Sequence, residues 1–167
     1  MAWESRRGFG IDIEGGAVRF YFDTSVLGAV TDREDPRRIE VTRRVLQSVA
    51  DGSHDGVISN VVQEELEQAP ADLRRAILQE INRIEFELVG EDLESRYLFE
   101  QYETARIVAA RYRNDLRHVA VATVARVDAL VSWNFRHLVN VRTRRSVHAV
   151  NVRLGYPLIE IVSPEEV

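Results

Sequence analysis

The 167-residue sequence contains no cysteine and no lysine, so all 22 of its basic residues are arginine. The absence of cysteine excludes a disulfide framework, a thiolate metal site and a cysteine nucleophile. No apolar run is long enough to span a membrane, and the N-terminus lacks the apolar segment of a secretion signal. We therefore expect a soluble, cytoplasmic protein whose basic side chains suit bidentate contacts with phosphate.

The formal net charge is −5, and 45% of the residues are hydrophobic. This length and hydrophobic content fit one globular domain with a sizeable core. The excess of negative charge argues against broad, non-specific binding of nucleic acid, although local basic patches remain open. Residues 1–17 are rich in glycine and show no helical or strand period. We predict that residues 1–17 form a flexible leader and that residues 18–167 form the domain.

An apolar, β-rich run from Val18 to Phe22 is typical of a strand buried on both faces. It ends abruptly in Asp23, which is followed by Thr24 and Ser25. In open α/β sheets, ligands bind beyond the carboxyl ends of the strands, so such a fold would place chemistry at Asp23. Asp23 could equally be the N-cap of a short helix over Thr24 to Val30. The sequence alone leaves both roles open.

Strands and helices alternate along the rest of the chain. The predicted strands cover residues 57–59, 86–89, 129–133 and 158–162. The predicted helices cover 36–50, 60–69, 70–84, 92–113 (as one helix or a helix pair), 116–127 and 135–154. Such alternation implies a parallel sheet with right-handed crossovers. The fold class is therefore α/β, with a central parallel sheet flanked by helices in three α/β/α layers.

The helix predicted to begin at Asn60 carries one apolar stripe. The stripe is formed by Val61, Val62, Leu66 and Ala69. At 100° per residue, Glu65 falls inside this stripe, whereas Glu64 and Glu67 fall well outside it. An inward carboxylate is costly unless it is paired or coordinates a metal, so Glu65 is a functional candidate. An ion pair with a buried arginine is the alternative.

Polar groups also follow or begin other predicted elements. Asp115 stands at the start of the buried helix, where it could be only a cap. His118, one turn on, could orient Asp115, touch a phosphate or be structural. Parallel strands bring distant segments to one edge, where we expect four groups to converge: Asp23, Glu65, Asp115 and Asn134. Hard oxygen ligands of this kind suit Mg²⁺ or Mn²⁺.

The ordered set of motifs resembles the PIN-domain nucleases, many of which are VapC-like toxins of toxin–antitoxin pairs. The matching segments are Phe22 to Leu27, Ile58-Ser59 with Glu65-Leu66, Asp115 to Ala122, and Leu130 to Phe135. The Ser-Trp-Asn-Phe sequence at residues 132–135 is similar to one PIN subgroup in particular. The resemblance implies a PIN-like domain with Mg²⁺- or Mn²⁺-dependent endoribonuclease activity. It also implies an RNA substrate, a small antitoxin partner and a homodimer.

The resemblance also assigns roles to residues. Asp23, Glu65 and Asp115 match the three metal-binding acids, and Asn134 occupies the place of a fourth, commonly Asp. An amide adds no negative charge, so a second metal should bind more weakly there. Four residues are expected near the substrate, the first two with helix capping as an alternative: Thr24, Ser25, Arg136 and His118. The competing interpretation is a catalytically weak or inactive PIN-like module that binds RNA or a protein partner.

Two other α/β enzyme classes place an aspartate after the first strand. Phosphoryl-receiver domains and haloacid-dehalogenase-type phosphatases both expect a partner lysine, which this chain lacks. The phosphatases also expect an acid at position 25, which is Ser25 here. The sequence therefore disfavours both classes.

Overall fold

The computed structural model describes residues 16–167. Its centre is a five-stranded sheet in the order β3-β2-β1-β4-β5, and every neighbouring pair is parallel. The strands are β1 (Arg19–Phe22), β2 (Asp55–Ser59), β3 (Phe86–Val89), β4 (Ala129–Val131) and β5 (Glu160–Val162). The predicted parallel sheet is confirmed. The leader predicted over residues 1–17 lies outside the described residues, apart from its last two positions.

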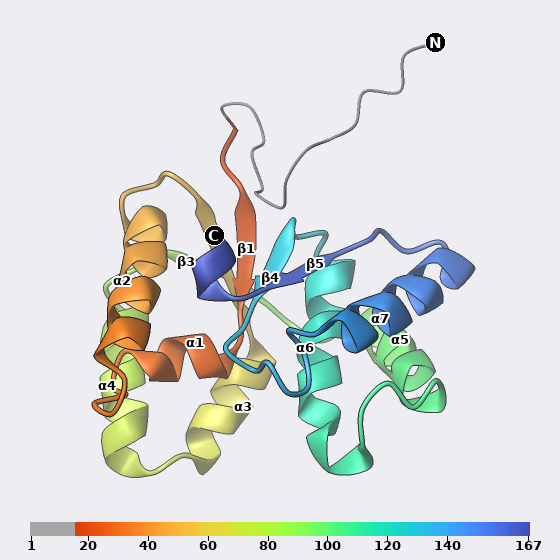
Figure 1. The fold of residues 1–167 in the computed structure, drawn as a ribbon, viewed down its shortest axis with the longest axis horizontal. Coiled ribbons are helices and arrows are strands. Elements are labelled where there is room, and N and C mark those ends of the chain that lie inside the picture. The colour runs from red at the N-terminus through yellow and green to blue at the C-terminus, as the bar shows by residue number, and fades with distance from the viewer. Residues whose placement is uncertain (1–15) are drawn as a thin grey trace.

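Helices cover both faces of the sheet (Figure 1). They are α1 (Thr24–Ala29), α2 (Pro36–Ala50), α3 (Asn60–Gln68), α4 (Ala71–Ile81), α5 (Leu93–Thr104), α6 (Arg113–Val124) and α7 (Val141–Leu154), with 3-10 turns at Ala110–Tyr112 and Pro164–Glu166. Helices α1, α2 and α4 lie on one side, and α5, α6 and α7 lie on the other (Figure 1). The predicted three-layer α/β/α arrangement is therefore confirmed.

The central strand β1 shows how the layers are built. Tyr21 packs into the core beneath α5, α6 and α7, whereas Phe20 and Phe22 pack into the core beneath α1, α2 and α4. All three side chains are at most 2% exposed. Because successive side chains of a strand point to opposite faces, only helices on both sides can bury all of them. The prediction of a strand buried on both faces is confirmed.

Several element boundaries differ from the predicted ones. Helix α7 begins at Val141 and not at residue 135, because Asn140 caps it by accepting a hydrogen bond from the backbone N–H of Thr143. Over residues 92–113, where one helix or a helix pair is predicted, α5 ends at Thr104 and a 3-10 turn at Ala110–Tyr112 precedes α6, which begins at Arg113. Asp115 therefore lies inside the first turn of α6.

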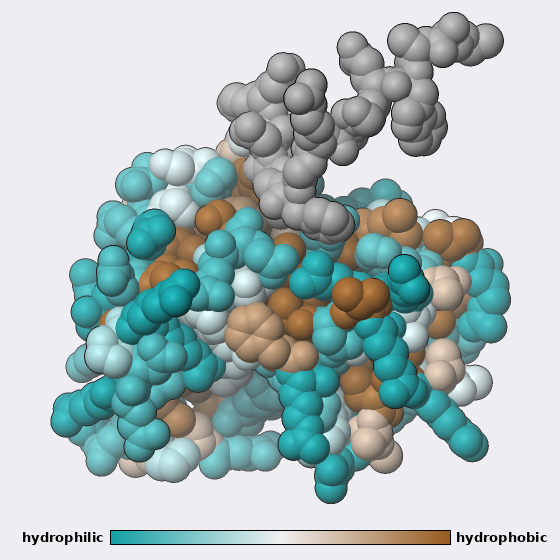
Figure 2. All heavy atoms as spheres, viewed as in Figure 1, coloured by the Kyte–Doolittle hydropathy of each residue, from teal (hydrophilic) through white to brown (hydrophobic). Residues whose placement is uncertain are grey.

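The outer surface is mostly hydrophilic on the face drawn in Figure 2, with hydrophobic residues in separate groups. Within residues 16–167, no helix combines the length and apolar character needed to cross a membrane. The carboxyl ends of the strands point to the lower edge of the sheet in Figure 1, where α1 and α3 begin. Among the predicted site residues, Asp23 and Asn134 follow β1 and β4. Glu65 lies on α3, which follows β2, and Asp115 lies in the first turn of α6.

Candidate functional site

Asp23 directly follows β1 and is buried. Its Oδ1 accepts hydrogen bonds from the Ser25 hydroxyl at 2.6 Å and from the backbone N–H of Val26 at 3.2 Å. Its Oδ2 accepts from the Ser132 hydroxyl at 2.6 Å. Burial raises the pKa of Asp23 above its ordinary value, and the hydrogen bonds offset part of this effect. Asp23 thus caps α1 and also stands at the carboxyl end of the central strand.

Ser25 and Ser132 bind the loop after β4 to Asp23. The Ser25 hydroxyl accepts from the backbone N–H of Trp133 at 2.9 Å, and the Ser132 hydroxyl accepts from the N–H of Asn134 at 2.9 Å. Each hydroxyl also donates to Asp23. Both serines therefore fix the position of the carboxylate. The sequence reasoning missed this role of Ser132, for which its place at the end of a buried strand was the available signal.

Glu65 points toward the interior of the protein, as the helical phase predicts. Its side chain is 25% exposed, whereas that of Glu64 is 46% exposed. Its Oε2 accepts from the Thr24 hydroxyl and lies 3.2 Å from Nε2 of His118. Burial alone would raise the pKa of Glu65, but the hydrogen bond and charge of His118 and the bond from Thr24 hold it below its ordinary value.

The predicted alternative partner of Glu65, a buried arginine, is not the one found. Arg117 of α6 pairs instead with Glu64 at 2.9 Å and with Glu91. The imidazole of His118 takes the place that the arginine was expected to fill. Arg117 is therefore paired with Glu64 and Glu91, and Glu65 contacts His118 instead.

His118 is 2% exposed and lies inside the protein. Its Nδ1 is 2.7 Å from the Tyr21 hydroxyl, which is also 2.6 Å from the Ser59 hydroxyl. Its Nε2 faces Glu65. Both ring nitrogens are thus engaged within the protein, which fits the structural role among the predicted alternatives, and the contact of His118 with a phosphate stays a prediction. His118 orients Glu65.

Asp115 and Asn134 form a hydrogen-bonded pair. The Nδ2 of Asn134 donates to Oδ2 of Asp115 at 3.0 Å, and Oδ1 of Asn134 accepts from the backbone N–H of His137 at 3.0 Å. The backbone donor fixes the orientation of the amide, because only its oxygen can accept. Burial, together with the charge of Asp23, raises the pKa of Asp115 to about 6. An amide donor at position 134 favours ionised Asp115, which a carboxylate there would oppose.

The chemistry of these acids fits a divalent cation. Asp115 lies close enough to Asp23 and Glu65 for both to raise its pKa. Within the described part of the chain, no ion pair involves Asp23 or Asp115. Carboxylates that are buried or half-buried and lack a cationic partner suit a metal that prefers oxygen ligands. As arranged among residues 16–167, however, no three acid or imidazole groups form a ready ligand set. Hydrogen bonds from serine, threonine and amide groups engage the acids instead.

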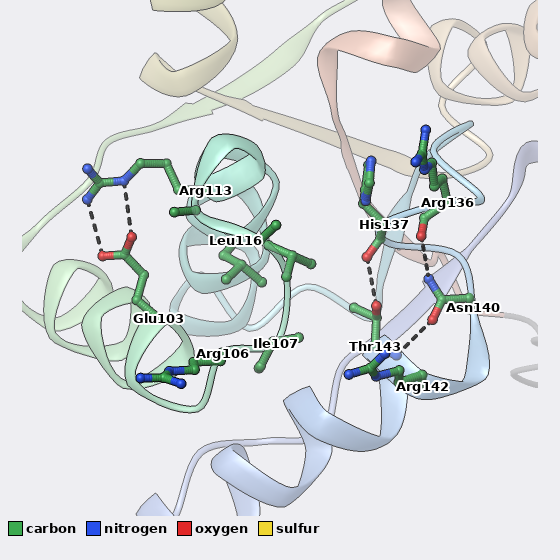
Figure 3. Close-up of a pocket in the computed structure, with 13 residues that line it drawn as sticks. Glu103, Arg106, Ile107, Arg113, Leu116, Arg136, His137, Asn140, Arg142 and Thr143 are labelled. Atoms are coloured by element: carbon green, nitrogen blue, oxygen red, sulfur yellow. Dashed lines mark hydrogen bonds and ion pairs between the residues drawn. The ribbon is translucent and has the colours of Figure 1, made fainter.

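Arg136 lies in the exposed turn that follows Asn134. With His137 it lines a cavity of about 580 Å³. Figure 3 shows two walls, one from α5, α6 and their connection and the other from residues 136–143. The three acids do not line this cavity, but the backbone N–H of His137 joins its wall to Asn134. Arg136 is thus a neighbour of the acids and does not belong to their cluster.

No protein-family sequence model matches this chain, and no curated protein matches it. Among solved structures, a chain in the crystal structure of VapBC2 from Rickettsia felis bound to a DNA fragment from their promoter is similar, with a TM-score of 0.58. The match covers 87% of this chain and 98% of that chain at 13% sequence identity. At this identity the similarity concerns the fold alone. The chain therefore forms a three-layer α/β/α domain of the PIN-like fold.

Proposed function

We propose that the protein is a Mg²⁺- or Mn²⁺-dependent endoribonuclease and the toxin of a type II toxin–antitoxin pair. The proposal is supported by the effect of two acids on a third: the charges of Asp23, after β1, and of Glu65, on α3, both raise the pKa of Asp115 on α6. The fold shared with a chain of a VapBC2 structure supports the assignment to a toxin. The proposed partners are RNA, a small antitoxin protein and a second copy of the chain, in the cytoplasm.

Asp23 and Asp115 are the proposed principal ligands of the divalent cation, and Glu65 is a further ligand through water. A cation bound there would activate water and neutralise charge on the phosphodiester. Ser25 and Ser132 hold Asp23 in one orientation through their hydroxyl groups. The orientation of Asp23 therefore depends on Ser25 of α1 and on Ser132, which follows β4.

Glu65 is the proposed acceptor of the proton that the attacking water loses. A general base must first be held in a fixed orientation within reach of the proton that it accepts. His118 and Thr24 supply the orientation through their contacts with Oε2. As the water oxygen bonds to phosphorus, the bond from phosphorus to the departing RNA oxygen breaks.

A second candidate function is a non-catalytic module that binds RNA or a protein partner. The contacts of Asn134 favour it, because both ends of the amide are already engaged, one with Asp115 and one with a backbone N–H. In that case the N–H group of Asn134 would stabilise the Asp115 carboxylate in place of a metal ion.

Cleavage of labelled RNA by Glu65→Gln and by Glu64→Gln tests the proposal. We expect the parent and Glu64→Gln to cleave in Mn²⁺ but not in chelator, and Glu65→Gln to be slower by about 100-fold or more. Glu64→Gln is a matched control, because it changes the neighbouring residue of α3 on the outer face. Equal rates for the two variants would reject Glu65 as the base. RNA binding without cleavage by the parent would favour the second candidate.

A further inference from the structure

We infer that the cavity beside the acids is a phosphate-binding subsite for the RNA strand next to the cleaved bond. This inference rests on the proposed function and names where the substrate is held. The proposed ligand is the phosphodiester backbone of single-stranded RNA, and the arginines bind it independently of the base sequence.

The cavity concentrates positive charge. Its lining includes four arginines, Arg106, Arg113, Arg136 and Arg142. Arg113 pairs with Glu103 through two contacts of 3.1 Å, whereas the other three arginines have no ion pair within residues 16–167. Three arginines without an ion pair thus line one cavity in a chain of formal net charge −5. Guanidinium groups match phosphate in geometry as well as in charge.

The arginines come from both walls of the cavity. Arg106 and Arg113 belong to one wall, and Arg136 and Arg142 belong to the other (Figure 3). The stacked rings of Tyr112 and His137, with centroids 3.6 Å apart, join the α5–α6 connection to the turn after Asn134. Because this contact holds the walls together, the site is largely formed before a ligand binds.

The cavity is also joined to the acids. Asn134 accepts from the backbone N–H of His137 in the cavity wall and donates to Asp115. Leu116 lines the cavity and directly follows Asp115 in α6. A strand with one phosphate at the acids would therefore place neighbouring phosphates near the arginines.

An acidic peptide from a protein partner could neutralise the same arginines. RNA is favoured because the cavity adjoins the acids that would cleave a phosphodiester. A nucleic acid strand also presents a charge at every nucleotide, which suits arginines on two facing walls. The acidic peptide is treated below as an outcome of the test.

The ends of α5 and α6 provide a matched pair of substitutions. Each helix ends in a Schellman motif with an arginine in the left-handed conformation, Arg106 at φ 51° and Arg126 at φ 55°. Glycine is favoured at such positions, because a side chain at positive φ is strained. Both arginines are exposed, but Arg106 lines the cavity and Arg126 precedes β4, at the opposite edge of the sheet. Arg106→Gly and Arg126→Gly therefore relieve the same strain and remove the same charge, and they differ in location.

The experiment measures binding of a short, fluorescently labelled single-stranded RNA by anisotropy, in chelator, so that no cleavage occurs. We expect Arg106→Gly to bind about fivefold more weakly at 0.1 M salt, with a dependence of log affinity on log salt that is smaller by about 0.7. We expect Arg126→Gly to bind like the parent. Both variants should unfold at a temperature about 3 °C higher than the parent, which shows that neither is damaged.

Equal RNA affinities for Arg106→Gly and Arg126→Gly would overturn the subsite. So would unchanged RNA binding by Arg106→Gly together with weaker binding of a labelled polyglutamate peptide, which would identify an acidic protein ligand. Glu65→Gln is measured in the same binding assay, because this substitution tests the proposed function and leaves the arginines of the subsite in place. Arginine-dependent binding without cleavage by the parent rejects the function and retains the subsite, whereas cleavage without an effect of Arg106 rejects the subsite alone.

Discussion

The Asp115→Asn substitution should stabilise the protein in the absence of metal and abolish its proposed activity. Burial and the charge of Asp23 raise the pKa of Asp115 from 3.8 to about 6, so ionisation of this carboxyl destabilises the folded state. Asparagine has the same shape and no charge. Its Oδ1 can still accept the hydrogen bond that Asn134 now donates to Asp115.

The difference between the two pKa values sets the size of the effect. One pKa unit corresponds to about 1.4 kcal/mol, so the ionised carboxyl would cost about 3 kcal/mol at neutral pH without solvent screening. Asp115 is partly exposed, and screening by water reduces this cost. We expect Asp115→Asn to raise the free energy of unfolding by about 1–2 kcal/mol at pH 7.

The advantage of Asp115→Asn should depend on pH. Below the ordinary pKa of 3.8, Asp115 is protonated in both the folded and the unfolded state, and the variant gains nothing. As the pH rises, the unfolded chain loses this proton first, and the parent loses stability until the folded carboxyl also ionises near pH 6. Urea unfolding in chelator at a series of pH values measures this change.

Asp72→Asn is the control for this substitution. Asp72 also lies in the first turn of a helix, α4, but its side chain is 97% exposed. Its replacement removes only a helix-dipole interaction and an exposed contact with Arg75, so we expect a loss of about 0.3–1 kcal/mol. Two results would refute the conclusion that burial and the charge of Asp23 destabilise ionised Asp115. One is a free energy of unfolding of Asp115→Asn no higher than that of the parent at pH 7, and the other is a difference between the two proteins that is the same at every pH.

Two further substitutions test the contacts around the acids. Asn134→Asp replaces the amide donor with a carboxylate facing Asp115, so we expect metal-free stability to fall by about 1–2 kcal/mol and Mn²⁺ to bind more tightly. Urea unfolding and calorimetry measure the two effects, and slower RNA cleavage at every Mn²⁺ concentration would instead identify Asn134 as a substrate contact. Tyr21→Phe deprives the buried His118 and Ser59 side chains of a hydrogen-bonding partner, so we expect a loss of about 1–3 kcal/mol in urea unfolding. Parental stability of Tyr21→Phe would show that these contacts are not formed in solution.

The sequence carries enough information for the sheet and for two of the acids. The run from Val18 to Phe22 lacks alternation because both faces of β1 are buried, and its end identifies the edge where Asp23 stands. The position of Glu65 follows from the period of one helix. Both patterns involve residues close together in the chain, so they can be recognised in a single sequence.

The contacts among distant residues could not be predicted in this way. Tyr21 and His118 are separated by 97 positions, and nothing near either residue indicates that they meet. The turn after Asn134 was predicted as helix because its composition fits one, whereas the amide oxygen caps the N–H of His137. The arginines of the cavity also come from separate segments, which only the packing of α5, α6 and the turn brings together.

Calorimetric titration with Mn²⁺ tests the proposed metal site most directly. The samples are the parent protein, Asp23→Asn and Asp115→Asn, each at neutral pH. We expect the parent to bind Mn²⁺ and both variants to bind it at least about tenfold more weakly, because each loses a carboxylate from the cluster. Equal affinity for Mn²⁺ in all three proteins would contradict the assignment of the acids as a metal site.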